Sequence, residues 1–156
     1  MKYLDDFEAG QIFNFRTAPL SEAEIVAFAS EWDPQRLHTD REYATRMHGG
    51  LIASGFQTLL MVFAPIMRDL MTGVANIGGM GFDQLRWLKP VYPGQPLDVR
   101  MEMLEIRHSR SKPDRGIMRY RLEAFNPAGE VVLSLETAAM VKRREQTGQP
   151  PGETAS

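Results

Sequence analysis

The sequence predicts an α+β fold in which an antiparallel β-sheet wraps one long central helix. Three observations support this prediction. Early in the chain, residues 21–32 combine helix-start signals with helical spacing of apolar residues. The segment "LIASGFQTLLMVFAPIMRDLMTG" is apolar nearly all round, as expected of a helix buried on most sides. After Gly73 the pattern changes to strict alternation of apolar and polar residues, which is typical of strands.

The first elements predicted are a strand in "QIFNFRTAP" and a helix over residues 21–32. Ser21 and Glu24 match a capping box, in which each side chain satisfies a free amide at the helix start. Asp33-Pro34 ends this helix, because the residue before a proline disfavours helical geometry. The expected inward face consists of Ile25, Phe28, Ala29 and Trp32.

Two further helices are predicted on either side of "HGG". The first begins at Asp40 as N-cap, stops at residues 48–50, and turns Tyr43, Ala44 and Met47 inward. The second is the long apolar helix, which Pro65 should kink or bring to its closing turns. We interpret its Leu, Met and Phe content as core packing, since Met adapts to irregular cores.

Long strands complete the chain. They are expected in residues 97–103, 118–124 and 131–141, with a β-bulge where the alternation slips at 104–106 and a turn at "NPAG". A further strand is predicted in "FDQLRWLKPVYPG", ending at Pro93-Gly94. We expect a single domain over residues 1–144 and a disordered tail over 145–156, where apolar residues are almost absent.

Composition excludes several classes of function. With 156 residues and a net charge of −2, the chain lacks the basic character of a nucleic-acid-binding domain. A local basic run, Arg107 to Arg115, is either a solvated loop or a site for an anion such as phosphate. There is no cysteine, and the N-terminal residues are too polar for a signal peptide. We expect a cytoplasmic protein that does not bind a membrane.

"EWDPQRLHTD" contains the first pair of chemically interesting residues, Asp33 and His38. Taken alone, Asp-Pro is a common turn and a histidine near a helix start is often structural. The context favours catalysis, because both residues lie in a loop that precedes a Gly-rich helix entry. The spacing itself leaves both interpretations open.

"GGLIASG" is the second motif. It is either a simple loop-to-helix junction, with Ser54 as a junction residue, or an oxyanion hole at Gly55. A backbone amide at a helix start stabilises negative charge, and glycine allows a carbonyl to approach closely. We predict no metal site, since His48 and His108 lack carboxylates at ligand spacing. P-loop, dinucleotide and G-x-S-x-G motifs are absent.

Two long segments resemble the MaoC-like dehydratases, the (R)-specific enoyl-CoA hydratase family with the hot-dog fold. They are "FASEWDPQRLHTDREYATRMHGGLIASGFQTLLM" and "GFDQLRWLKPVYPGQPLDVRMEM". The most specific parts are Asp-x4-His followed by Thr-Asp, the Ala-Ser-Gly helix entry, and "LRWLKPVYPG". The resemblance extends from about Phe7 to Lys142.

This resemblance implies a homodimer or higher homo-oligomer that takes a coenzyme A thioester between helix and sheet. We expect no cofactor. The catalytic pair of the family corresponds to Asp33 and His38, and its oxyanion-hole amide to Gly55. The implied reaction is reversible syn hydration of a trans-2-enoyl-CoA by general acid–base catalysis. The chain departs from the common family pattern in the Asp–His spacer, at Ser54 and near Thr58. We therefore expect substrate binding at Gln35, Arg36, Ser54 and Thr58.

Two alternatives stay open. A thioesterase of the same fold would activate water against the carbonyl carbon and would not need His38. A non-catalytic acyl-CoA-binding protein would keep the Asp33–His38 pair without turnover.

Overall fold

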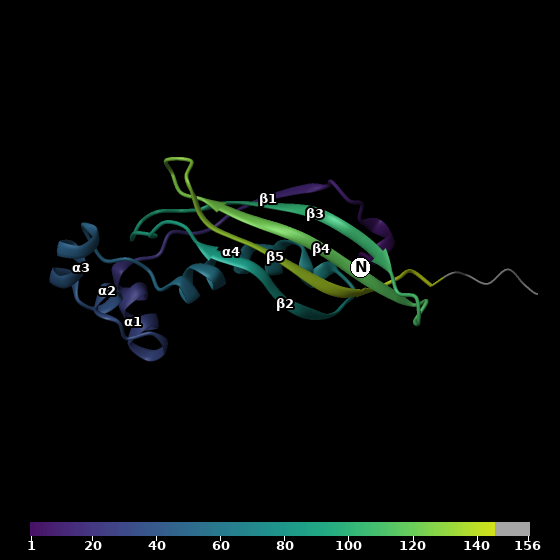
Figure 1. Cartoon of the computed structure of the whole chain (residues 1–156), viewed down its shortest axis with the longest axis horizontal. Helices are drawn as coiled ribbons and strands as arrows, with labels where there is room; N and C mark the ends of the chain where they lie inside the picture. The colour runs from purple at the N-terminus through teal and green to yellow at the C-terminus, as the bar shows by residue number, and fades with distance from the viewer. Residues whose placement is uncertain (146–156) are drawn as a thin grey trace, which may run out of the picture.

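A five-stranded antiparallel sheet and one long helix dominate the computed structural model, which describes residues 1–145 (Figure 1). The strand order is β1-β3-β4-β5-β2, so β1 and β2 form the two edges. The strands are β1 (Ile12–Arg16), β2 (Asn76–Trp87), β3 (Asp98–His108), β4 (Arg115–Phe125) and β5 (Val131–Lys142). The predicted α+β class and hot-dog architecture are thus confirmed. Most of the predicted tail, residues 146–156, lies outside the described residues.

The sheet follows the alternation in the sequence closely. Along β4, every second residue is buried, and β3 and β5 pack their apolar residues on the same face. The predicted bulge is present, as a shift of register between Met103 and Glu105 where β3 pairs with β4. The strand predicted in "FDQLRWLKPVYPG", with its end at Pro93-Gly94, lies earlier in the chain than expected. This strand is β2, which begins at Asn76 and ends at Trp87.

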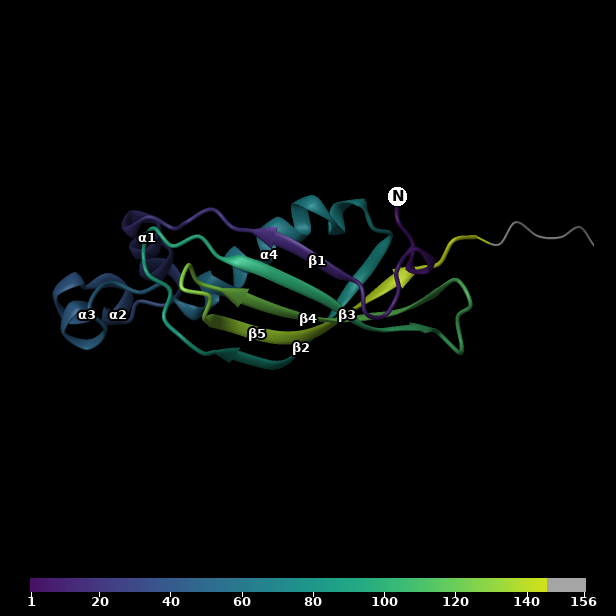
Figure 2. The ribbon, with the colours of Figure 1, turned by 90° about the horizontal axis from the view of Figure 1, so that it is seen from above.

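Helix α4 (Gly55–Asp69) lies against one face of the sheet, as the turned view shows (Figure 2). Its Met61, Val62 and Ile66 join the apolar residues of β3, β4 and β5 in one hydrophobic core. Pro65 lies in the closing turns of the helix, as predicted. The expectation of burial on most sides is wrong for one face, because Phe56 and Leu60 are 57% and 58% exposed.

Three short helices lie together at one end of the sheet (Figure 1). They are α1 (Glu22–Trp32), α2 (Arg36–Thr39) and α3 (Arg41–His48). The Ser21–Glu24 capping box and the Asp40 N-cap of α3 are both present. Helix α2 was not predicted, since it is a single turn within what the sequence presents as a loop.

Two apolar residues of these helices are not inward-facing as predicted. Trp32 and Met47 are 69% and 58% exposed, whereas Ile25, Ala29 and Ala44 are buried. Trp32 is the last residue of α1 and Met47 the last but one of α3, so both lie at helix ends. A further two 3-10 turns, η1 (Leu4–Asp6) and η2 (Met71–Gly73), flank the sheet. No helix among the described residues is long and apolar enough to cross a membrane.

Candidate active site

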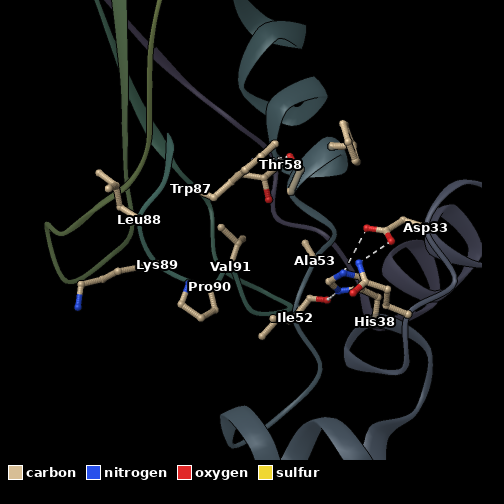
Figure 3. Close-up of a pocket in the computed structure, with 13 residues that line it drawn as sticks. Asp33, His38, Ile52, Ala53, Thr58, Trp87, Leu88, Lys89, Pro90 and Val91 are labelled. Carbon is tan, nitrogen blue, oxygen red and sulfur yellow. Dashed lines mark hydrogen bonds and ion pairs between the residues drawn. The ribbon is translucent and has the colours of Figure 1, made fainter. Parts of the chain in front are cut away.

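A cavity of about 400 Å³ opens at the end of the sheet that carries the three short helices (Figure 3). Its walls come from four places in the chain: the α1–α2 connection with α2, residues 52–53, the start of α4, and residues 87–91 at the end of β2. Most of the lining is apolar. The ionisable groups within it are Asp33, His38 and Lys89.

Asp33 and His38 meet in this cavity. Oδ2 of Asp33 lies 3.4 Å from Nε2 of His38. Asp33 is the C-cap of α1, and Pro34 turns the chain so that the one-turn helix α2 can begin at Arg36. His38 is on that turn and is only 5% exposed. The five-residue separation therefore places the carboxylate and the imidazole side by side, because the intervening residues form a turn of helix.

A second contact fixes the orientation of the His38 ring. Its Nδ1 lies 2.7 Å from the carbonyl oxygen of Ile52. A carbonyl oxygen only accepts, so Nδ1 carries a proton and donates it to Ile52, which leaves Nε2 as the ring nitrogen that faces Asp33. Oδ2 of Asp33 and Nε2 of His38 then face one point. Such a pair can bind a water molecule and share one proton between carboxylate and imidazole.

The Asp33 carboxylate is held by two further donors. Nε2 of Gln35 donates to Oδ1 at 2.8 Å, and Oγ of Ser54 donates to Oδ2 at 2.8 Å. The hydrogen bond from Gln35 contributes most to lowering the pKa of Asp33. The hydrogen bond from Ser54 and the proximity of His38 lower it further, so this pKa lies below its ordinary value despite partial burial. Asp33 is thus a carboxylate at neutral pH.

Helix α4 begins at Gly55, which lines the same cavity. Among the described residues, nothing accepts a hydrogen bond from the Gly55 amide, as is usual for the first turn of a helix. The positive end of the helix dipole adds to its attraction for negative charge. Thr58, 2% exposed, lines the cavity from the same turn.

The Trp87 indole leaves no space for a side chain at position 55. A Cβ at this position would lie 2.6 Å from Nε1 and Cε2 of the Trp87 indole. Nε1 of Trp87 donates a 2.7 Å hydrogen bond to the carbonyl oxygen of Gly55, and the Phe56 ring meets the indole edge-on. Trp87 therefore forms a wall of the cavity that is anchored to the start of α4.

The four residues predicted to bind substrate differ in their position relative to the cavity. Gln35 and Thr58 line the cavity, and Gln35 also holds Asp33. Ser54 is fully buried behind the carboxylate that it hydrogen-bonds. Arg36 lies outside the cavity, where it binds Asp40 through two nitrogens and covers the Tyr43 ring.

Trp87 and the segment that follows it were not predicted as site residues. Their motif, "LRWLKPVYPG", was among the parts that carry the family resemblance, but sequence spacing gives no indication that it faces Asp33. Only the approach of β2 to α4 shows this. Within residues 1–145, no group of three His, Cys, Asp or Glu side chains has the arrangement of a metal site.

Comparison with known proteins agrees with this fold. The family model described as "MaoC like domain" matches residues 6–124. An uncharacterized protein of Bacillus subtilis, YdeM, is 33% identical over 141 residues, which cover 90% of this chain and 99% of that protein. The crystal structure of a MaoC-like dehydratase from Rhodospirillum rubrum superimposes with a TM-score of 0.80 at 34% identity, over 94% of this chain and 100% of the other.

Two similar proteins carry names that describe an activity. The mesaconyl-CoA hydratase of Cereibacter sphaeroides is 32% identical over 95 residues, which are 60% of this chain and only 26% of that protein. The R-hydratase PhaJ1 of Pseudomonas aeruginosa has a TM-score of 0.69 at 26% identity, over 98% of this chain and 96% of the other.

Proposed function

Because the chain belongs to the MaoC-like dehydratase family, we propose that it is a hydro-lyase that reversibly hydrates a trans-2-enoyl-CoA. The observation that carries the proposal is the Asp33–His38 pair. A carboxylate oxygen and an imidazole nitrogen lie 3.4 Å apart in one cavity, with the free amide of Gly55 in its wall. General acid–base catalysis on a thioester requires these groups together.

In the proposed reaction, a water molecule is bound at the point that Asp33 and Nε2 of His38 both face. One of the two groups takes a proton from the water as its oxygen bonds to C3 of the enoyl chain. The electrons of the double bond move toward the thioester carbonyl, and the Gly55 amide donates a hydrogen bond to the oxygen that becomes negative. The proton taken from the water passes across the contact between Asp33 and His38, and the pair then delivers it to C2. The product is a 3-hydroxyacyl thioester, and dehydration follows the same steps in reverse.

The fixed proton positions support this assignment. Nδ1 of His38 is committed to the Ile52 carbonyl, so only Nε2 is free to exchange a proton. The donors Gln35 and Ser54 keep Asp33 ionised and restrict its rotation. The Asp33 carboxylate and Nε2 of His38 are therefore the two positions of the pair that can exchange a proton with water.

The apolar part of the cavity would receive the acyl chain. Ile52, Trp87 and Val91 line it beside the catalytic pair. Thr58 provides a hydroxyl near the start of α4, and Gln35 presents an amide at the cavity. The activities named for the mesaconyl-CoA and R-hydratases are consistent with an enoyl thioester substrate of this kind.

We also propose that the protein is a homodimer in the cytoplasm. β2 is an edge strand of twelve residues whose outer hydrogen-bonding groups face no other strand of the described chain. A second copy would cover the exposed apolar residues of β2 and of α4. They are Phe56, Leu60, Ile77, Met80 and Phe82.

The alternative functions can be separated by a single assay on the purified protein. A panel of trans-2-enoyl-CoA thioesters of increasing chain length is followed by loss of the conjugated-enoyl absorbance, with free thiol measured in parallel. A hydratase removes the absorbance and releases no thiol. Stoichiometric thiol release would instead identify a thioesterase. Binding across the whole panel without either change would identify a non-catalytic acyl-CoA-binding protein.

A further inference from the structure

The basic run of the sequence forms a hollow at the turn between β3 and β4. Residues 107–112 and 115–117, with Met140, line a cavity of about 430 Å³ that is separate from the one that contains Asp33. Four of the lining side chains are cations: Arg107, Arg110, Lys112 and Arg115. We call this segment the basic hairpin (residues 107–115).

Positive charge is in excess in this hollow. Arg115 pairs with Asp114 at 2.8 Å, and Arg107 has a longer contact of 3.4 Å with Glu105. Arg110 and Lys112 form no ion pair with any described residue. The hydroxyls of Ser109 and Ser111 belong to the same hollow. Unpaired cations together with hydroxyl donors suit the oxygens of a phosphate.

Within one chain the basic hairpin is far from the catalytic pair, at the opposite end of the sheet (Figure 1). The register shows this directly. His108, Gly116, Val141 and Asn76 are successive cross-strand partners at the hairpin end. Val99, Ala124, Leu133 and Trp87 are partners in the same way at the end that carries the active-site cavity. The hairpin is thus in line with the start of β2, and the cavity with its end.

In a dimer, the basic hairpin of one subunit can lie near the active-site cavity of the other. If two β2 edges pair antiparallel about a two-fold axis, the start of one β2 lies beside the end of the other. The basic hairpin of each subunit then lies at the same end of the joined sheet as the cavity of its partner. Counting strand spacings from β2 to the partner's β4 and β3 gives a separation of roughly 14–19 Å. The extended pantetheine arm, which joins the thioester sulfur to the diphosphate of coenzyme A, is of comparable length.

We propose that the basic hairpin of one subunit binds the phosphate groups of the coenzyme whose acyl group lies at the Asp33–His38 pair of the other subunit. This inference rests on the proposed function and on pairing through β2. Each substrate site is then formed by both chains: one chain supplies the catalytic pair, and the other binds the phosphates.

The first test compares two substrates that differ only in their phosphates. The variant Arg110→Ala/Lys112→Ala is assayed with an enoyl-CoA and with the matching enoyl-pantetheine, which has no phosphate. We expect KM for the CoA thioester to rise roughly tenfold or more, with kcat and all constants for the pantetheine thioester unchanged. The control Arg16→Ala/Arg46→Ala makes the same change in net charge elsewhere. An unchanged KM for the CoA thioester, or equal effects on both substrates, would overturn the proposal.

The second test asks whether the hairpin acts on its own subunit or on the partner. Asp33→Asn chains and Arg110→Ala/Lys112→Ala chains are co-expressed with different tags, and the mixed dimer is isolated. In that dimer, one site combines an intact Asp33 with the intact hairpin of the other chain. We expect this site to show wild-type KM at half the wild-type kcat per dimer. A KM as high as that of the hairpin-variant homodimer would show that the hairpin acts within its own chain and would contradict the proposal.

A third measurement keeps the inference distinct from the proposed reaction. Binding of free coenzyme A and of inorganic phosphate is measured by calorimetry on the dimer, without any turnover. We expect the hairpin variant to lose affinity for coenzyme A by the same factor as KM rises. If only inorganic phosphate binding weakens, the hairpin is a simple anion site and the coenzyme assignment is wrong. If the wild type binds coenzyme A through the hairpin but hydrates nothing, the proposed reaction fails while the phosphate site stands.

Discussion

Oγ of Ser54 donates a 2.8 Å hydrogen bond to Oδ2 of Asp33, although 21 positions separate the two residues in the chain. This contact joins the end of α1 to the residue before α4, and Asp33 and Gly55 line the same cavity. Ser54 thus acts on the proposed chemistry through Asp33, without reaching the cavity itself.

Replacing this serine should change the pH dependence of the reaction. Ser54→Ala removes one of the hydrogen bonds that lower the pKa of Asp33, so that pKa rises toward its ordinary value. Protonation of Asp33 then occurs at higher pH, and the acid limb of the kcat/KM profile should move to higher pH. The Ser54 side chain makes no helix-capping bond, so α4 should keep its stability. Ser30→Ala, which alters an exposed hydroxyl on α1, is the matched control. A limb at the wild-type pH would show that Ser54 does not tune Asp33.

Gly55→Ala should destabilise the protein through Trp87. The new Cβ would lie 2.6 Å from the indole, which must move and give up its hydrogen bond to the Gly55 carbonyl. We expect a loss of about 1–3 kcal/mol in the free energy of unfolding, measured by denaturant titration. Adding Trp87→Leu should recover part of that loss, because the two residues are coupled. Gly73→Ala, with no atom within 4 Å of the added Cβ, is the control. Strictly additive effects in the double variant would rule out the coupling.

Trp87 should also limit the size of the acyl chain. Its indole occupies the wall of the cavity beside Gly55, so Trp87→Ala enlarges the space next to the catalytic pair. We expect the ratio of kcat/KM for long over short enoyl-CoA substrates to rise roughly tenfold or more. The ratio is measured within each variant, which cancels any general loss of active protein. Trp32→Ala, at an exposed position outside the cavity, should leave the ratio unchanged. An unchanged ratio in Trp87→Ala would exclude this role.

The edge strand β2 should determine the oligomeric state. Met80 is 54% exposed on this strand, and Met80→Glu would place like charges near each other where two β2 edges pair. We expect sedimentation velocity to show a shift from dimer to monomer at micromolar concentration. Met47→Glu, on α3 and 58% exposed, should remain dimeric. A dimer that persists in Met80→Glu would place the interface elsewhere.

The strands, the buried face of the sheet and the helix starts were predictable from the sequence, because the patterns that indicate them are local. Alternation along β3, β4 and β5 gives the sheet and its buried face, and the Ser21–Glu24 box and Asp40 give the helix starts. Such signals depend only on neighbouring residues. Helix α2 was missed for the same reason, since one turn of helix has too few residues to show a period.

The site was predictable in part. Asp33, His38 and Gly55 were identified from their motifs and do meet in one cavity. The functions of Ser54 and Arg36 could not be read from the sequence, because they depend on which way each side chain turns: Ser54 toward Asp33 and Arg36 toward Asp40. Trp87 reaches the cavity only through the pairing of β2 with β5, a contact between residues far apart in the chain.

The central claim is that Asp33 and His38 catalyse hydration together, and it is tested most directly by two near-isosteric variants. Asp33→Asn keeps an oxygen that can accept from Ser54 but removes the charge. His38→Asn keeps a donor for the Ile52 carbonyl but removes Nε2. With the substrate that the wild type hydrates fastest, we expect kcat to fall roughly a hundredfold or more in each variant, with enoyl-CoA still bound. Near-wild-type kcat in both variants would contradict the account.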